Sequence, residues 1–226
     1  MDYLTGTSKI HPAEGFLENF PDTVVRETIE KHYRNTDFSQ GSKDEIDVRS
    51  VKYLKLKGAR NFTGLELFCN VENVLLTACV IKDTKTVLYN WRRLKYINVN
   101  ECIVYTMLFP KELEDLKIVD FRKCRFENSF MGPNMTVVRL PEKAPKLTEI
   151  IFIESDDPHK ERQALIFPKE MDNILYINLY YARLFSVRFN CKVLPNLEIL
   201  DLSGNGVAIC DEKCFPEMPK LKRYRK

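Results

Sequence analysis

The chain has 226 residues, of which 44% are hydrophobic and 30% charged, so it is long and apolar enough to bury a full core. Its 35 basic residues are nearly balanced by 32 acidic ones, which argues against a dedicated nucleic-acid-binding protein. No run of about 18 apolar residues occurs, which excludes a long apolar membrane-spanning helix.

The first ten residues, Met1 to Ile10, lack the basic segment and the following apolar segment of a signal peptide. The sequence therefore predicts a cytoplasmic or nuclear protein. If the chain is a trimmed form of a longer product, a secreted protein is the alternative.

One amphipathic helix is predicted near the start of the chain. Asp22 stands where an N-cap would, and Val25, Ile29 and Tyr33 follow at helical spacing. A stack of repeats needs an end cap with a polar outer surface, so we expect residues 1–47 to form a helical cap and a linker. The alternative is that this helix docks a partner.

From residue 48 onward a nine-residue pattern recurs. Its clearest copy is Leu197-Glu-Ile-Leu-Asp-Leu-Ser-Gly-Asn205, with apolar residues at positions one, four and six and asparagine at position nine. Such a block predicts a short strand that runs into a tight turn. Seven blocks and a partial eighth begin at Val51, Val71, Leu94, Leu116, Leu147, Ile174, Leu197 and Leu221.

In this pattern residues 48–226 resemble the leucine-rich-repeat proteins, whose repeats are about 20 to 29 residues long. Here successive blocks start 20 to 31 residues apart, and cysteine replaces asparagine in several copies. The resemblance implies an α/β solenoid of seven to eight repeats, with a parallel sheet on the concave face. It also implies irregular or short helical convex arms, and recognition of macromolecules through the concave face without any chemistry.

The stack is expected to be interrupted where the spacing lengthens. The 31-residue step contains Met135 to Leu140, which indicates an extra or degenerate strand, and the 27-residue step carries a charged insertion from Glu154 to Arg162. Phe-Pro pairs at 109–110, 167–168 and 215–216 each precede a block. We expect them in the returning arms, because proline cannot donate to a strand ladder.

The seven cysteines are expected to be mostly reduced and structural. Cys79, Cys102 and Cys124 all fall at position nine, where the side chain should turn inward. Cys210 and Cys214 are spaced for a disulfide or for half of a metal site, but no matching Cys or His pair accompanies them. No metal and no cofactor are therefore expected.

The register also predicts which side chains a partner could reach. Positions three, five, seven and eight should point outward, and one, four, six and nine inward. Tyrosine buries a large area at low entropic cost and is enriched at interfaces. The candidate partner-binding residues are Ile151, Ile153, Tyr176, Asn178, Tyr180, Tyr181, Tyr96 and Arg122. The alternative is that another segment of the same chain covers them.

These features predict a non-enzymatic module that recognises another protein, or serves as an adaptor, through the concave face. The chain has no glycine-rich phosphate loop, no nucleophile elbow and no His-Glu-x-x-His helix. The alternative is a secreted or cell-surface recognition domain of the immune or receptor type. Two glycosylation motifs, Asn61-Phe-Thr63 and Asn134-Met-Thr136, would matter in that case.

Overall fold

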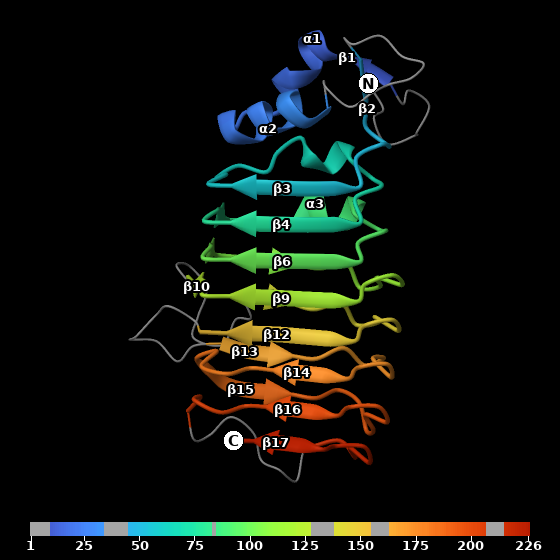
Figure 1. Ribbon diagram of the computed structural model, residues 1–226, viewed down its shortest axis with the longest axis vertical. Helices are drawn as coiled ribbons and strands as arrows, with labels where there is room; N and C mark the ends of the chain where they lie inside the picture. The colour runs from blue at the N-terminus through green and yellow to red at the C-terminus, as the bar shows by residue number, and fades with distance from the viewer. Residues whose placement is uncertain (1–9, 34–44, 83–84, 128–137, 155–162, 207–214) are drawn as a thin grey trace.

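The computed structural model describes residues 10–33, 45–82, 85–127, 138–154, 163–206 and 215–226. From residue 48 onward these wind into stacked coils, and each coil adds one strand to a parallel sheet of eight (Figure 1). In order along the sheet the strands are β3 (Tyr53–Lys57), β4 (Asn73–Thr77), β6 (Tyr96–Asn100), β9 (Ile118–Arg122), β12 (Glu149–Ile153), β14 (Tyr176–Asn178), β16 (Ile199–Asp201) and β17 (Arg223–Arg225). The chain is a parallel β-solenoid of the leucine-rich-repeat type, and the predicted fold class is confirmed.

The core is built from the same three positions of each block. In β3, Tyr53 and Lys55 are exposed, whereas Leu54 and Leu56 have no exposed surface. Positions one, four and six are buried in every coil from β3 to β16. Each fully buried aliphatic side chain contributes about 1.5 to 3 kcal/mol. In the last coil Tyr224 occupies position four and is 40% exposed, because β17 forms the edge of the sheet.

Cysteine takes over the hydrogen bonds of asparagine at position nine. The Asn205 side-chain amide donates to the carbonyl oxygen of Leu179 in the preceding coil at 2.6 Å. The thiol of Cys124 donates to the equivalent carbonyl of Val99 at 3.3 Å. Both bonds tie one coil to the next inside the stack. The buried cysteine thiols at this position belong to Cys79, Cys102 and Cys124.

A left-handed residue at position eight ends each strand from β3 to β16. In the coils from β3 to β14, the backbone N–H at this position donates to a carbonyl of the next coil, as between Glu101 and Arg122 at 2.9 Å. Position eight therefore lies in a turn at the edge of the sheet, directly after the strand, and its residues are exposed or half-buried. The residues with positive φ here are Gly58, Ala78, Glu101, Lys123, Glu154, Tyr181 and Gly204.

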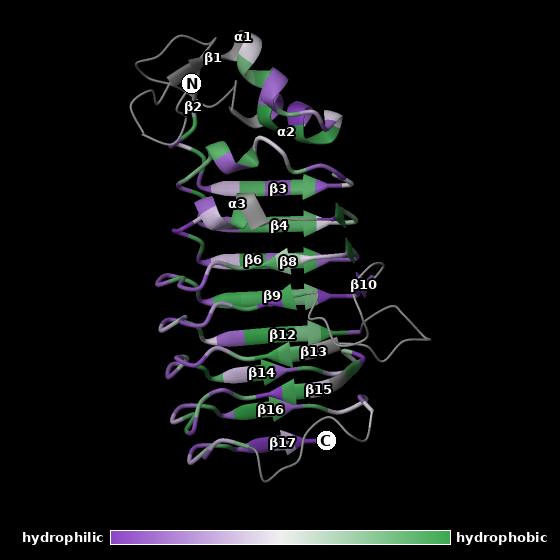
Figure 2. Ribbon diagram, turned by 180° about the vertical axis from the view of Figure 1, so that it is seen from behind, coloured by the Kyte–Doolittle hydropathy of each residue, from purple (hydrophilic) through white to green (hydrophobic). Residues whose placement is uncertain are grey.

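The side of the stack opposite the main sheet changes from helices to strands along the chain. The first coils carry η2 (Leu65–Leu67) and α3 (Lys85–Asn90), as expected of short helical arms. Later coils carry the parallel pairs β8 (Met107–Leu108) with β11 (Val138–Arg139), and β13 (Gln163–Ile166) with β15 (Leu184–Arg188). Figure 2 shows β8, β13 and β15 on this side, running opposite to the main strands.

The expectation of helical or irregular arms was thus wrong for the later coils, because neighbouring arms pair there as parallel strands. The extra strand predicted within Met135 to Leu140 corresponds to β11, which lies on this side of the stack and not in the main sheet. A fourth parallel sheet is formed by the segments that follow the turns after the main strands. It consists of β5 (Val80–Ile81), β7 (Ile103–Val104) and β10 (Arg125–Phe126).

The N-terminal segment packs against the first coil (Figure 1). It comprises β1 (Ile10–Pro12) antiparallel to β2 (Glu45–Asp47), α1 (Ala13–Phe16), η1 (Leu17–Asn19) and α2 (Thr23–Tyr33). Val25 and Ile29 of α2 are fully buried, as their helical spacing predicted.

Asp22 joins this segment to the solenoid. Its Oδ1 accepts the N–H groups of Val24 and Val25 at 3.0 and 3.2 Å, as expected of an N-cap. Its Oδ2 accepts the N–H groups of Arg60 and Asn61 in the first coil at 2.7 and 2.9 Å. Burial alone would raise the pKa of Asp22, but these four N–H donors lower it.

Candidate functional site

The outward-facing side of the eight-stranded sheet, called the sheet face below, carries the side chains at positions three, five and seven. The strands are in register, so equal positions form columns across the sheet. The position-three column is Tyr53, Asn73, Tyr96, Ile118, Glu149, Tyr176, Ile199 and Arg223. The position-five column is Lys55, Leu75, Asn98, Asp120, Ile151, Asn178, Asp201 and Arg225.

A polar network fixes the middle of the sheet face. Asp120 is only 7% exposed, and its carboxylate accepts a hydrogen bond from Asn98 Nδ2 at 3.0 Å and pairs with Arg122 Nε at 2.9 Å. The hydrogen bond to Asp120 raises the pKa of Arg122, and the nearby Tyr176 and Glu149 add to this rise. The predicted contact residue Arg122 is therefore held in place while its side chain stays 46% exposed.

The prediction that Ile151 offers an exposed contact was wrong, because its side chain is only 6% exposed. It lies between Asp120 and Asn178 in the position-five column, in register with both. Strands about 4.8 Å apart let such neighbours cover a central side chain from both sides. Its neighbour in sequence at position seven, Ile153, keeps part of its surface accessible.

Four of the predicted residues meet in the C-terminal half of the sheet face. Asn178 Nδ2 donates to the hydroxyl oxygen of Tyr176 at 2.7 Å, and Asn178 Oδ1 accepts the Tyr180 N–H at 3.0 Å. The rings of Tyr180 and Tyr181 meet edge to face at 4.7 Å and remain 39% and 44% exposed. The Tyr181 ring also lies against Gly204, where any side chain would overlap it. Tyr180 is therefore the freer of the two to contact a partner.

A hollow on the sheet face lies in its N-terminal half, away from that tyrosine pair. This hollow, called the N-terminal groove below, has a volume of about 370 Å³ and spans β3, β4, β6 and β9. Of the predicted contact residues only Tyr96 lines it. The sequence reasoning missed Asn73 and Leu75, because it compared positions within a block and not along a column. The lining residues are Tyr53, Asn73, Val74, Leu75, Tyr96, Ile97, Asn98, Ile118 and Asp120.

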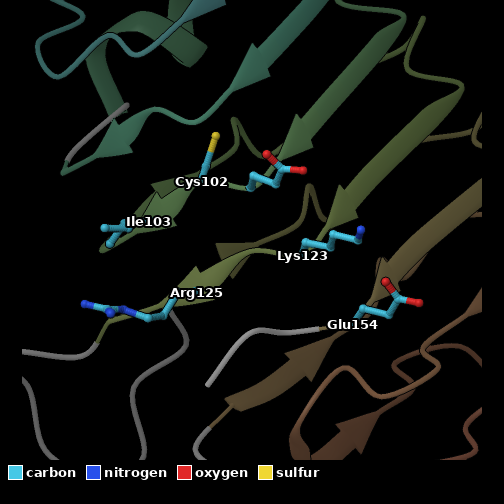
Figure 3. Close-up of a pocket in the computed structure, with 6 residues that line it drawn as sticks. Cys102, Ile103, Lys123, Arg125 and Glu154 are labelled. Carbon is cyan, nitrogen blue, oxygen red and sulfur yellow. The ribbon is translucent and has the colours of Figure 1, made fainter. Parts of the chain in front are cut away.

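A second hollow, of about 630 Å³, lies at the edge of the sheet where the strands turn (Figure 3). Figure 3 shows Arg125 directed away from Lys123 and Glu154, so its charge does not converge with theirs. Cys102 lies at the hollow but is only 1% exposed. Its hydrogen bond with the thiol of Cys79 raises the pKa of Cys102, which keeps this thiol protonated. The arrangement provides neither an activated nucleophile nor a focused charge.

Some predicted features lie outside the described residues, namely Cys210, Cys214, Asn134 and most of the charged insertion. Within the described ranges no group of three or more His, Cys, Asp or Glu side chains is placed to hold a metal ion. None of the helices in the described part of the chain has the length and apolar character that a membrane crossing requires.

The comparisons with known proteins assign no family. No protein-family model matches the chain, and no curated protein matches it in sequence. A solved structure of an internalin from Listeria monocytogenes is similar over 95% of this chain and 73% of its own, at 13% identity and a TM-score of 0.48. A likeness at this level carries no functional argument. The chain is a solenoid of stacked coils whose strands form one parallel sheet of eight.

Proposed function

We propose that the protein is a non-enzymatic recognition module or adaptor that binds another protein through the sheet face. The observation that carries this proposal is the placement of exposed tyrosine on a rigid sheet. Tyr53, Tyr96 and Tyr180 are 51%, 37% and 39% exposed, whereas the apolar side chains at positions one, four and six are buried in every coil from β3 to β16. Exposed aromatic rings on a preorganised surface favour association, because little conformational entropy is lost on binding.

The titratable groups of the sheet face support binding more than catalysis. Asp120 is neutralised by Arg122, and Asp201 accepts hydrogen bonds from the Ser203 N–H at 3.0 Å and lies 3.6 Å from Arg225. A general acid or base needs a proton that it can exchange with a substrate, and carboxylates held in this way are poorly suited to that task. We therefore assign no catalytic residue.

The secreted alternative depends on different residues. Asn61 is exposed, and its Oδ1 accepts the Thr63 N–H at 3.0 Å, so the first glycosylation motif is accessible. The buried cysteines at position nine (Cys79, Cys102 and Cys124), called the cysteine ladder below, argue against a secreted protein, because their thiols stay reduced while serving as hydrogen-bond donors. This ladder favours the adaptor function.

The test is affinity capture from native extract with the double variant Tyr176→Ala/Tyr180→Ala. The matched control is Tyr89→Ala, which removes a ring of similar exposure from α3, away from the main sheet. Loss of a captured protein with the double variant alone, at an unchanged melting temperature, supports the proposal. Equal capture by all proteins, or loss with the control, contradicts it.

A further inference from the structure

The N-terminal groove is flanked by two tyrosines of the position-three column. Tyr53 and Tyr96 stand on β3 and β6, with Asn73 of β4 between them. Strands spaced by about 4.8 Å place the two tyrosine backbones about 9.6 Å apart. A flat group that lies between the two rings, with a contact distance of about 3.5 to 4.0 Å to each, requires the rings to be about 7 to 8 Å apart. The opening between the rings therefore takes one side chain at a time.

The floor between the rings offers apolar contact together with one amide. Leu75 and Ile118 line it beside the tyrosines and are partly accessible. Asn98 is committed to Asp120, whereas the Asn73 side chain has no hydrogen-bond partner among the described residues. A carboxamide both donates and accepts, so it can pair with the N–H and C=O of a peptide group. This combination suits an aliphatic or aromatic residue within a peptide.

The surroundings of the groove are positively charged. Hydrogen bonding to Lys95 lowers the pKa of Glu72. Burial opposes this shift, whereas the nearby Lys52 and Arg93 add to it. The Lys117 ammonium lies 6.0 Å from the centre of the Tyr96 ring. Five exposed cations near the groove make no ion pair with a described residue; they are Lys52, Lys55, Lys57, Arg93 and Lys117.

Three acidic groups near these cations are already paired. Glu72 pairs with Lys95 at 2.7 Å and Asp115 with Lys146 at 2.7 Å. Asp120, the one charged residue that lines the groove, is paired with Arg122. The excess positive charge is thus available to a ligand, and it favours one that carries negative charge.

We infer that the N-terminal groove binds an acidic peptide segment that inserts one large apolar side chain between Tyr53 and Tyr96. Asp or Glu residues on both sides of this anchor face Lys55 and Lys57 of β3 and the cations that precede β3, β6 and β9. The inference rests on the proposed function and specifies its partner class. Single-stranded nucleic acid also combines rings with negative charge, but it fits less well, because a carboxylate lies in the floor and the floor contacts are aliphatic.

The experiment is a selection of random seven-residue peptides, displayed on phage, against the full chain. Enriched peptides are then synthesised and titrated by fluorescence anisotropy against Tyr53→Ala/Tyr96→Ala and Lys55→Glu/Lys57→Glu. The matched control for charge is Lys111→Glu/Lys192→Glu, at exposed positions outside the main sheet. Melting temperatures within a few degrees of the unsubstituted chain verify that each variant is folded.

The expected peptides carry at least two Asp or Glu residues around one large apolar residue. Each groove variant weakens their binding about tenfold or more, and the control leaves it within about twofold. An absence of selected peptides, peptides without acidic enrichment, or equal binding by the groove variants overturns the inference. Tighter binding of oligothymidylate at the groove also overturns it.

The variant Tyr176→Ala/Tyr180→Ala separates this inference from the proposed function. If only this variant loses the peptides, the sheet face is the binding surface and the groove assignment is wrong. If neither this variant nor the groove variants lose them, both proposals fail.

Discussion

The left-handed turn at position eight predicts that two mirror substitutions, glycine to alanine at position 58 and alanine to glycine at position 78, change the stability in opposite directions. Gly58 has φ of +84°, and a Cβ built there meets nothing within 4 Å, so Gly58→Ala adds only backbone strain. Ala78 has φ of 51° at the equivalent position of the next coil and is exposed, so Ala78→Gly removes that strain. Both residues donate their N–H to the next coil, so the hydrogen bonds are the same in the two tests.

The magnitude follows from two opposing contributions. A left-handed conformation costs an L-residue about 1 to 2 kcal/mol, whereas glycine loses about 0.4 to 1 kcal/mol more backbone entropy than alanine on folding. Ala78→Gly should therefore raise the free energy of unfolding by about 0.5 to 1 kcal/mol, and Gly58→Ala should lower it by a similar amount. In a chain of this size 1 kcal/mol corresponds to about 2 to 4 °C in Tm.

Trp91 supplies the assay, because it is the chain's single tryptophan and is 2% exposed. Its emission should shift to longer wavelength on unfolding in urea. A control, Lys55→Gly in the middle of β3, should be destabilising by about 0.5 to 1 kcal/mol, because glycine weakens a strand. Stabilisation by Gly58→Ala, or the same sign for both mirror substitutions, would refute the strain argument.

Three further predictions concern the cap, the cysteine ladder and the last turn. Asp22→Ala should lower the free energy of unfolding by about 2 kcal/mol in urea titration, because it removes an N-cap and the link to the first coil. The pKa of Asp22 is lowered from 3.8, so its contribution to stability is present above about pH 4 and is lost as the pH falls through the lower pKa of the folded state. The difference in free energy of unfolding between the unsubstituted chain and Asp22→Asn should therefore shrink on acidification, and a difference that grows would contradict this. Burial raises the pKa of Cys124 to about 11, so iodoacetamide near pH 8 should label the exposed Cys69 in the native protein and reach Cys124 only after unfolding, as peptide mass spectrometry would show. Gly204→Ala should lower the Tm more than Gly58→Ala does, because the added Cβ overlaps the Tyr181 ring. Equal losses of Tm would contradict the position of that ring against Gly204.

The coil-by-coil order of the fold could be predicted because one block of nine residues carries it. The apolar residues at positions one, four and six and the small polar residue at position nine report local burial. For example, Leu197, Leu200 and Leu202 are 0%, 0% and 2% exposed. The left-handed turn was not recognised, because five of its seven residues are not glycine and glycine is the usual sign of such a turn.

The binding surface could be predicted only in part, because it depends on neighbours that are distant in sequence. Ile151 occupies an outward position but is covered by Asp120 and Asn178 from other coils. The groove between Tyr53 and Tyr96 is formed by residues of several coils, so it can be recognised only by comparing position three across three successive coils. Reading the blocks as columns would have found both features.

Photo-crosslinking tests most directly whether the sheet face is the binding surface. A benzophenone-bearing residue replaces Leu75 in the N-terminal groove, Tyr180 in the C-terminal half of the face, or Lys111 outside the main sheet, and each protein is irradiated with a selected acidic peptide. We predict crosslinking at position 75 and none at position 111. Crosslinking at position 111, or none at either position on the sheet face, would contradict the assignment of this face as the binding surface.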